Sequence, residues 1–325
     1  MQEPIQPVSP LNEPPPPAES QSEFVAVFLR PDGMLRAGWR LLLYLLMGLA
    51  LVFAMGFVLG SMRHLGITAI WRGFISEATL VIAAFLPAIV MTKIEHRPFG
   101  DYGLSLQNTF GKFFWIGAAW GFCALTALLL VLRASHVFYF GGIALHGVRI
   151  LKFALFYLLF FLLVSFFEEF LFRGYTLFTG STSVGFWPSA IVLSLLFGSV
   201  HLGNSGESPI GALAAAAIGL FFCLTVRRTG DLWFAVGFHT SWNWGQSYLY
   251  SVPNSGTKMT GHLTSSSLQG PVWLSGGSVG PEGSFLCFVL IVLLWIAFNR
   301  VYPETRYPLT TVKLQLPVED QSIIN

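Results

Sequence analysis

Long apolar runs without a charged side chain are the feature that most constrains this chain. Residues 41–62 contain no charge and lie between Arg40 and Arg63, and residues 113–132 are equally free of charge. A helix that spans a membrane needs about 20 predominantly apolar residues. These runs therefore predict helices that cross a membrane.

Six further candidate spans follow from the same pattern. They cover about 74–92, 151–172, 187–201, 208–226, 232–257 and 283–299. The chain is 54% hydrophobic and 10% charged, whereas a soluble domain carries about 25% charged residues. The fold class expected is all-α, a polytopic membrane bundle of about eight transmembrane helices. A net charge of +2 is too small to indicate a nucleic-acid partner.

The flanking segments and the loop charges suggest a topology. Residues 1–25 are predicted to be a disordered Pro-rich tail, 26–302 the membrane bundle and 303–325 a C-terminal tail. With both termini cytoplasmic, the inside segments hold 12 of the 18 Lys and Arg residues and the outside segments hold 6. We therefore expect an integral, multi-pass protein with cytoplasmic termini, in the plasma membrane if the source is bacterial.

Local signals predict how several helices begin and pack. Ser208 followed by Pro209 can cap the sixth helix, and Asp231 can cap the seventh. Small residues in the sixth helix, and GxxxG strings starting at Gly56 and Gly117, permit close helix packing. Three cysteines lie in apolar runs without metal-ligand spacing and are expected to be free, buried thiols: Cys123, Cys223 and Cys287.

A cluster of charged side chains interrupts the fourth apolar run. Glu168, Glu169 and Arg173 lie within a stretch whose other residues are Phe or Leu. Burying an ionised side chain at mid-helix costs about 3 kcal/mol. Glu169 and Arg173 are four residues apart and can pair, which leaves Glu168 without a local partner. The cluster is either a structural ion pair that closes a helix end or a functional carboxylate with its support.

Three more polar residues lie in apolar runs. His201 ends the fifth span, where a satisfied interfacial histidine is one reading. His239 and Asn243 are four residues apart in the seventh span, share a helix face and can also serve as interhelical hydrogen-bond partners. Together with Glu168 these residues supply a general base, its partner and hydrogen-bond donors.

The combination resembles a known family. The strings from Glu168 to Arg173, from Phe197 to His201 and from His239 to Asn243 resemble the three signature motifs of the CPBP (Abi) intramembrane proteases, relatives of the type II CAAX prenyl endopeptidases. The resemblance covers about residues 150–250, the expected catalytic core, and implies an eight-helix fold.

The resemblance also implies roles for these side chains in peptide-bond hydrolysis at the membrane. Glu168 and His201 would position and deprotonate the attacking water, and His239 and Asn243 would stabilise the oxyanion. Glu169 and Arg173 would support the site by orienting Glu168. The implied partners are a hydrophobic or lipidated peptide substrate and membrane lipids.

A metal centre is the open alternative for the mechanism. Members of the family are often described as metalloproteases, and Glu168, His201 and His239 could in principle bind Zn²⁺. The chain has no HExxH string, the usual signal of a zinc protease. We therefore expect that no cofactor is required.

Two other function classes remain. A transporter would also bury carboxylates and histidines, but it would often show inverted repeats, and the ionisable cluster here lies in one half, with Glu77 alone in the other. A non-catalytic scaffold or bacteriocin-immunity protein of the same fold is the runner-up.

One internal conflict yields a structural expectation. The nominal spans place Glu168 and His201 at depths that differ by roughly 10–20 Å, given about 1.5 Å per helical residue. If both line one site, the fourth helix is expected to continue past Arg173 towards Phe178.

Overall fold

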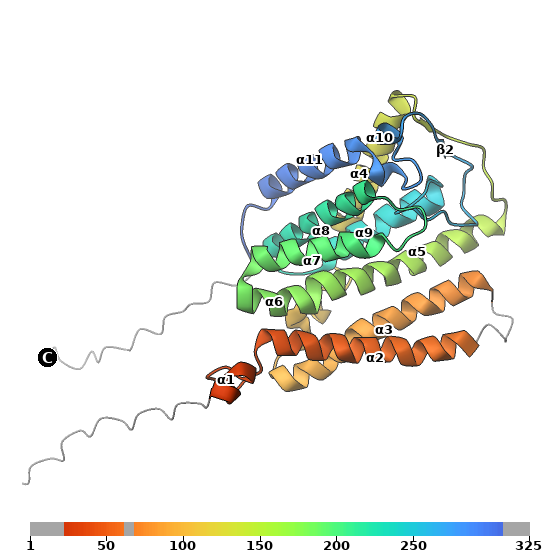
Figure 1. Cartoon of the computed structure of the whole chain (residues 1–325). Helices are drawn as coiled ribbons and strands as arrows, with labels where there is room; N and C mark the ends of the chain where they lie inside the picture. Colours follow the sequence, from red (N-terminus) through yellow and green to blue (C-terminus); the bar gives the residue numbers. More distant parts are fainter. Residues whose placement is uncertain (1–22, 62–67, 308–325) are drawn as a thin grey trace, which may run out of the picture.

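The computed structural model describes residues 23–61 and 68–307 (Figure 1). Residues 1–22 of the predicted tail, and residues 308–325 of the predicted C-terminal tail, lie outside this range. The last three residues of the predicted N-terminal tail are helical, because they begin the short helix α1 (Glu23–Phe28).

Eight longer helices make up the described bundle, which confirms the predicted fold class. They are α2 (Ala37–Ser61), α3 (Ala69–Glu95), α4 (Lys112–Ala134), α5 (Val148–Glu169), α7 (Phe186–His201), α8 (Pro209–Thr229), α9 (Trp233–Trp244) and α11 (Phe285–Val301). Five helical stretches in the described residues are long and apolar enough to span a membrane. α7 and α11 are shorter apolar helices, and α9 gains length from the π-helical segment that follows it.

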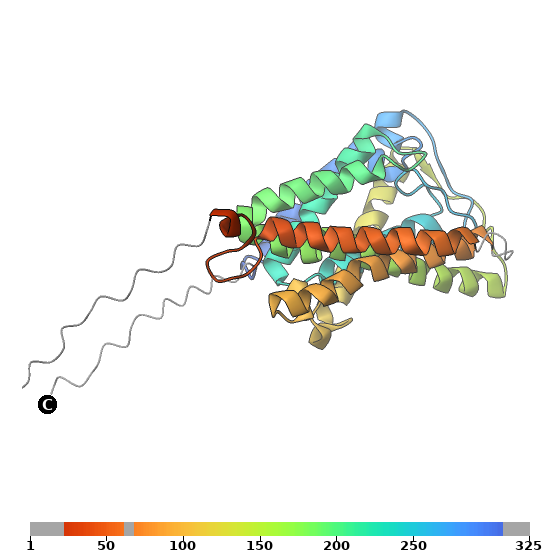
Figure 2. The ribbon, with the colours of Figure 1, turned by 60° about the horizontal axis from the view of Figure 1, so that its bottom comes forward.

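The helices enclose α9 and leave the first hairpin on the outside (Figures 1 and 2). α2 and α3 lie together on one side of α5, whereas α7, α8 and α11 lie on its other side. α4 packs along α9 over most of its length. Apolar side chains on the outer faces, such as Phe53 and Phe57, are exposed, as expected of a surface that faces lipid.

Glycines explain the close contact between α4 and α9. A Cβ on Gly117 would lie 2.1 Å from the Phe234 carbonyl oxygen, and one on Gly121 would lie 2.3 Å from that of Phe238. The second GxxxG string is therefore a helix contact. The first string has open space around Gly56, and its glycines do not mediate packing between described helices.

The fourth span continues beyond the predicted end, as the depth conflict indicated. α5 passes into a π-helical segment, η4 (Phe170–Tyr175), and then into α6 (Thr176–Val184), with a kink at Gly174. The helical path from Val148 to Val184 is 37 residues long. This extension moves the Glu168 pair towards the middle of the bundle.

Short elements close the two ends. They are η2 (Phe99–Tyr102), η3 (Leu106–Asn108), β1 (Phe138–Tyr139), β2 (Ser267–Leu268), α10 (Val272–Ser275) and η6 (Pro281–Gly283). β1 and β2 pair antiparallel, with Phe138 opposite Leu268. The pairing ties the long connection before α11 to the segment that follows α4.

One predicted cap forms, the other does not, and one burial prediction is wrong. The Ser208 hydroxyl accepts the Gly211 N–H at 3.1 Å at the start of α8. The N-cap of α9 is Leu232, without a side-chain cap hydrogen bond, although Asp231 before it accepts the Trp233 N–H at 3.0 Å. Cys223 and Cys287 are free and buried, but Cys123 is exposed because it lies on the outer face of α4.

Candidate active site

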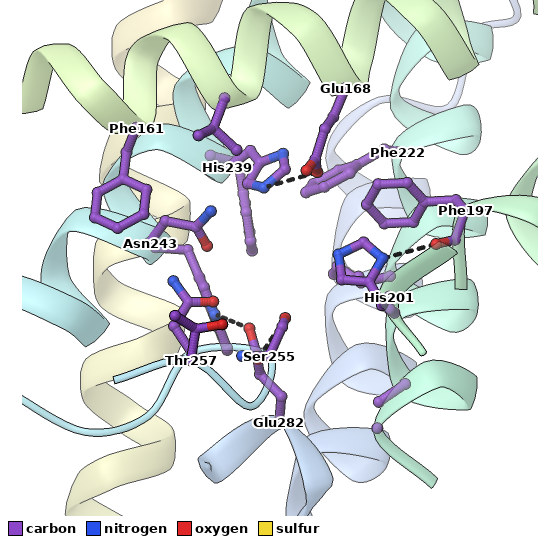
Figure 3. A pocket seen from close by; sticks show the side chains of 18 of the residues that line it. Phe161, Glu168, Phe197, His201, Phe222, His239, Asn243, Ser255, Thr257 and Glu282 are labelled. Carbon is purple, nitrogen blue, oxygen red and sulfur yellow. Dashed lines mark hydrogen bonds and ion pairs between the residues drawn. The ribbon is translucent and has the colours of Figure 1, made fainter. Parts of the chain in front are cut away.

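A cavity of about 310 Å³ lies inside the bundle. Side chains from α3, α5, α7, α8, α9 and α11 line it, together with the segment that follows η5 (Gly245–Leu249). All four residues predicted to be catalytic are among them: Glu168, His201, His239 and Asn243. Figure 3 shows the Glu168 carboxylate at the top of this space, with His239 and Asn243 to its left and His201 to its right.

His239 lies between two carboxylates from α5. Its Nδ1 is 2.9 Å from Glu169 Oε1, and its Nε2 is 3.7 Å from Glu168 Oε2. A carboxylate can only accept from an imidazole N–H, so Nδ1 carries a proton in this arrangement. Glu169 therefore holds the ring with Nε2 directed towards Glu168 and the cavity, and it supports His239 rather than Glu168.

Arg173 supports Glu169 from behind, in a fully buried position. Its Nη1 lies 3.4 Å from Glu169 Oε1, which confirms the predicted pair. Its guanidinium also lies 4.0 Å from the centre of the Phe197 ring, a cation–π contact. A Cβ on Gly219 would fall 2.1 Å from Arg173 Nη2, so α8 has a glycine where the guanidinium needs room.

The local charges balance if His239 is doubly protonated. Glu168 and Glu169 contribute two negative charges, while Arg173 and an imidazolium at His239 contribute two positive ones. Charges inside a membrane protein persist when they are paired in this way. The doubly protonated ring also has an N–H at Nε2 that can donate into the cavity.

His201 also carries a proton on Nδ1, but its partner there is a backbone carbonyl oxygen. Its Nδ1 lies 2.7 Å from the Phe197 carbonyl oxygen. A carbonyl only accepts, so Nδ1 is the donor, and in the neutral ring Nε2 is left as an acceptor. His201 lines the cavity, as Figure 3 shows, and can accept a proton there.

Asn243 lies one turn after His239 on the same face of α9. Its side chain is 8% exposed, lines the cavity and makes no hydrogen bond to any residue that the structure describes. Buried amides normally have partners, so an amide left free beside a cavity is available to a bound molecule. Its N–H groups can donate to an oxygen there.

Both helices that carry these residues change to π-helical geometry directly after them. η4 begins at Phe170, next to Glu169, and η5 begins at Gly245, two residues after Asn243. Single π turns inside α-helices are frequent at functional sites. Here the regular helices end directly after residues that line the cavity, Glu168 and Asn243.

Glu282 organises the wall opposite Glu168. One of its carboxylate oxygens accepts the Trp242 indole N–H at 3.1 Å, and the other accepts the Ser255 N–H at 2.6 Å and its hydroxyl at 3.0 Å. Ser255 and Gly256 have φ values of +43° and +76° and form a tight turn between Asn254 and Thr257. The carboxylate thus holds a non-glycine residue in a left-handed conformation at the cavity wall.

The segment after His201 supports the same turn. The Asn204 side-chain amide donates to the Ser255 carbonyl at 2.8 Å. Burial raises the pKa of the neighbouring Glu207 carboxyl above its ordinary value, although the Ser208 N–H donated to it acts in the opposite direction. The end of α7 is therefore tied to the turn that faces it.

The described side chains do not assemble a metal-binding set. Within residues 23–61 and 68–307, no three His, Cys, Asp or Glu side chains lie close enough to hold one ion. Glu168 Oε2 lies 3.7 Å from His239 Nε2, but His201 does not form a group of three with them. The set expected for zinc, Glu168 with His201 and His239, does not fit a metal in this arrangement.

The fold and the cavity define an integral membrane protein with groups suited to hydrolysis buried inside it. A family model described as type II CAAX prenyl endopeptidase Rce1-like matches residues 150–245. Residues 150–245 are therefore similar to this protease family, and the predicted resemblance is confirmed over that range. Comparison with the curated proteins and with the solved structures gave no match.

Several cavity residues escaped the sequence analysis. Those with polar side chains are Asn204, Asn254, Ser255, Thr257 and Glu282. They lie in polar, Gly- and Ser-rich connections, where such residues are ordinary. Glu77 was conspicuous as an acid within an apolar run, but it was weighed only as a sign of transport.

Proposed function

We propose that the chain is an intramembrane endopeptidase that hydrolyses a peptide bond in a membrane-associated or lipidated, CAAX-like substrate. The observation that carries the proposal is the shared cavity of Glu168, His201, His239 and Asn243. The Rce1-like match supports the same reaction class. The substrate would enter an apolar bundle, which favours a hydrophobic or lipidated peptide and membrane lipids as partners.

The proton positions suggest how water is activated. His201 presents Nε2 as an acceptor, because its Nδ1 donates to Phe197. Glu168 Oε2 is buried and makes no hydrogen bond to a described residue. A water bound between these two groups can lose a proton to one of them as it attacks the carbonyl carbon. The same group can return the proton to the leaving amine.

The other side of the cavity supplies donors for the developing oxyanion. His239 Nε2 and the Asn243 amide lie on one face of α9, and both can donate to one oxygen. The 3.7 Å gap between His239 Nε2 and Glu168 is longer than a hydrogen bond, which leaves this donor for the substrate. Removing one oxyanion donor from a protease costs about 10²–10³ in kcat.

The first test uses variants of the proposed base and its partners. Glu168→Ala, His201→Ala and His239→Ala are each expected to abolish cleavage of a prenylated peptide by the purified protein in proteoliposomes. The matched control is Glu304→Ala, which removes an exposed glutamate. A placed proton-transfer group contributes about 10²–10⁴-fold, so activity above a tenth of wild type in Glu168→Ala would remove Glu168 as the base. A wild type that cleaves no peptide would favour the non-catalytic scaffold.

A second test separates a glutamate mechanism from a zinc mechanism. Asn243→Asp keeps the size of the side chain but removes its N–H donors, so we expect about a 100-fold loss of kcat. A strong chelator is expected to leave the wild type active. Loss of activity on chelation, restored by stoichiometric Zn²⁺, would instead assign Glu168, His201 and His239 as ligands.

A further inference from the structure

Glu77 brings a third glutamate to the catalytic cavity. It lies on α3, outside the matched range of residues 150–245, and lines the cavity together with Glu168 and Glu282. The lining contains no Lys or Arg among the described residues. The cavity therefore carries an excess of acidic groups inside an otherwise apolar bundle.

The other two glutamates have polar neighbours. Glu282 accepts three hydrogen bonds, and Glu168 Oε2, which makes no hydrogen bond, lies 3.7 Å from His239 Nε2. Glu77 has neither a hydrogen bond nor an ion pair with any residue in the described part of the chain. Arg72, on the same helix, lines a separate hollow between α2 and α3.

Ring contacts fix the level of Glu77 along α5. Phe74 contacts Phe156 at 5.7 Å, and Phe85 contacts Phe166 at 6.2 Å. Glu77 lies three residues after Phe74, so it is level with about residue 159 of α5, which is about nine residues or about 14 Å along the helix from Glu168. An extended peptide advances about 3.3 Å per residue, so this distance corresponds to about four substrate residues.

A carboxylate without a partner at this depth needs compensation. Ionisable groups in membrane helices pair with one another or mark a ligand pathway. The free Asn243 amide, 8% exposed and directed into the same cavity, is an independent sign that a bound molecule completes this space. An apolar peptide with one cationic side chain could pack against the apolar cavity wall and pair with the Glu77 carboxylate.

On the basis of the proposed function, we propose that Glu77 forms a subsite for a cationic side chain, which binds a Lys or Arg about four residues from the scissile bond. Burial removes the cation from water, and this desolvation cost is offset only when a charged Glu77 lies within pairing distance. A substrate with an acidic residue at that position would be repelled by Glu77 and Glu168 together.

The test compares prenylated peptides that differ at one position. Lys, norleucine or Glu is placed in turn at each of about five positions on either side of the cleaved bond, a range that includes the expected distance of about four residues, and kcat/KM is measured in proteoliposomes. The wild type is expected to prefer Lys to norleucine by about tenfold at one position, the range of a charge-assisted hydrogen bond. Glu77→Gln should reduce this ratio to about one, and Glu77→Lys should reverse the preference towards Glu.

A control variant and a binding assay make the outcomes separable. Asp101→Asn removes an exposed acid outside the cavity and should keep the preference for Lys. Fluorescein-labelled Lys and norleucine peptides are also titrated onto Glu168→Ala, with and without Glu77→Gln. A Glu77-dependent preference in binding without any cleavage by the wild type would support the subsite and contradict the proposed hydrolysis.

Two results would overturn the subsite. One is a wild type that shows no preference for Lys in cleavage or in binding. The other is a Glu77→Gln variant that loses activity equally on the Lys and norleucine peptides, because a constant ratio assigns Glu77 a role other than recognition. In either case, Glu168-dependent cleavage would leave the proposed function in place.

Discussion

At the scale of single residues, the site depends on the contacts that orient His239. Glu169 accepts from His239 and is itself paired with Arg173, so three buried residues form one chain of contacts from the back of the cavity to its wall. The role of Glu169 follows from this contact. It fixes the orientation of a histidine on another helix, as a carboxylate does in other hydrolases.

Arg173→Ala is expected to lower both stability and turnover. The change leaves Glu169 buried without its cation, and breaking a buried pair costs about 3–5 kcal/mol. It also empties the space between Phe197 and Gly219. The measurement is the thermal midpoint in detergent beside kcat/KM.

The matched control for Arg173→Ala is Arg149→Ala. This variant removes an exposed arginine that contacts only the Phe153 ring and should leave the midpoint unchanged. An Arg173→Ala protein as stable as wild type, with reduced turnover alone, would place Arg173 in the substrate site instead.

The cost of burying charge made these residues predictable. Glu168, Glu169 and Arg173 were conspicuous because each is expensive in an apolar run, and their i, i+4 spacing gave one pair correctly. The contact between Glu169 and His239 joins residues 70 positions apart, and no local pattern encodes it. The sequence did not single out Glu282, because a glutamate in a polar connection can remain in water and has no burial cost.

At the scale of helices, two GxxxG strings with the same spacing have different roles. Gly117 and Gly121 let α4 approach the backbone of α9, which carries His239 and Asn243. Gly56 faces open space. The spacing permits a close contact, but the partner helix decides whether one forms.

Gly121→Ala is therefore expected to be destabilising and to reduce activity. Its Cβ would lie 2.3 Å from the Phe238 carbonyl oxygen and 2.5 Å from the Ser241 hydroxyl oxygen, so α9 must shift. Overpacking of this kind costs about 1–3 kcal/mol. Gly56→Ala is the control and should not lower the thermal midpoint, since alanine is the better helix former by about 1 kcal/mol.

The same measurement tests whether the contact positions the catalytic helix. Equal midpoints and equal kcat/KM for Gly121→Ala and Gly56→Ala would contradict it. Loss of stability in Gly121→Ala with unchanged kcat/KM would show that α9 tolerates the shift at His239.

Helix extents were predictable from hydrophobic runs, whereas helix geometry was not. Eight apolar runs gave eight helices, and the conflict in depth between Glu168 and His201 indicated the extension of α5. The predicted run 232–257 was too long, because the helical path ends at Leu249 and the chain then turns at the cavity wall. The π-helical segments η4 and η5 depend on tertiary contacts, since their sequences carry no periodicity of their own. No local pattern in the sequence therefore predicts them.

At the scale of the whole molecule, a buried ion pair connects the first hairpin to the catalytic helix. Arg40 of α2 lies 2.7 Å from Glu95 at the end of α3, and the pair is almost fully buried. The Tyr175 hydroxyl of η4 donates to Glu95 at 2.5 Å, and Arg40 reaches the Thr182 hydroxyl of α6 at 3.1 Å. The hairpin that carries Glu77 is thereby fixed against the helix that carries Glu168.

This network is expected to act through position rather than chemistry. Arg40→Ala leaves Glu95 buried without its cation and should lower the thermal midpoint, with a loss of about 3–5 kcal/mol. Glu95→Leu strands Arg40 and should cost a similar amount. Arg40→Leu combined with Glu95→Leu removes both charges, and replacing a buried pair by apolar side chains is often neutral or stabilising.

A double-mutant cycle on this pair therefore decides how the hairpin is held. The thermal midpoint of the double variant should return most of the way to that of the wild type. The coupling energy from the cycle should then be well above about 0.5 kcal/mol, the deviation from additivity that is found for distant sites. If the pair also sets the position of Glu77, the preference for a Lys-containing peptide should fall in the single variants and return with stability in the double variant. Additive losses would contradict the coupling, and a lost preference in a stable double variant would show that the ion pair itself, and not the packing of the hairpin, places Glu77 at the cavity.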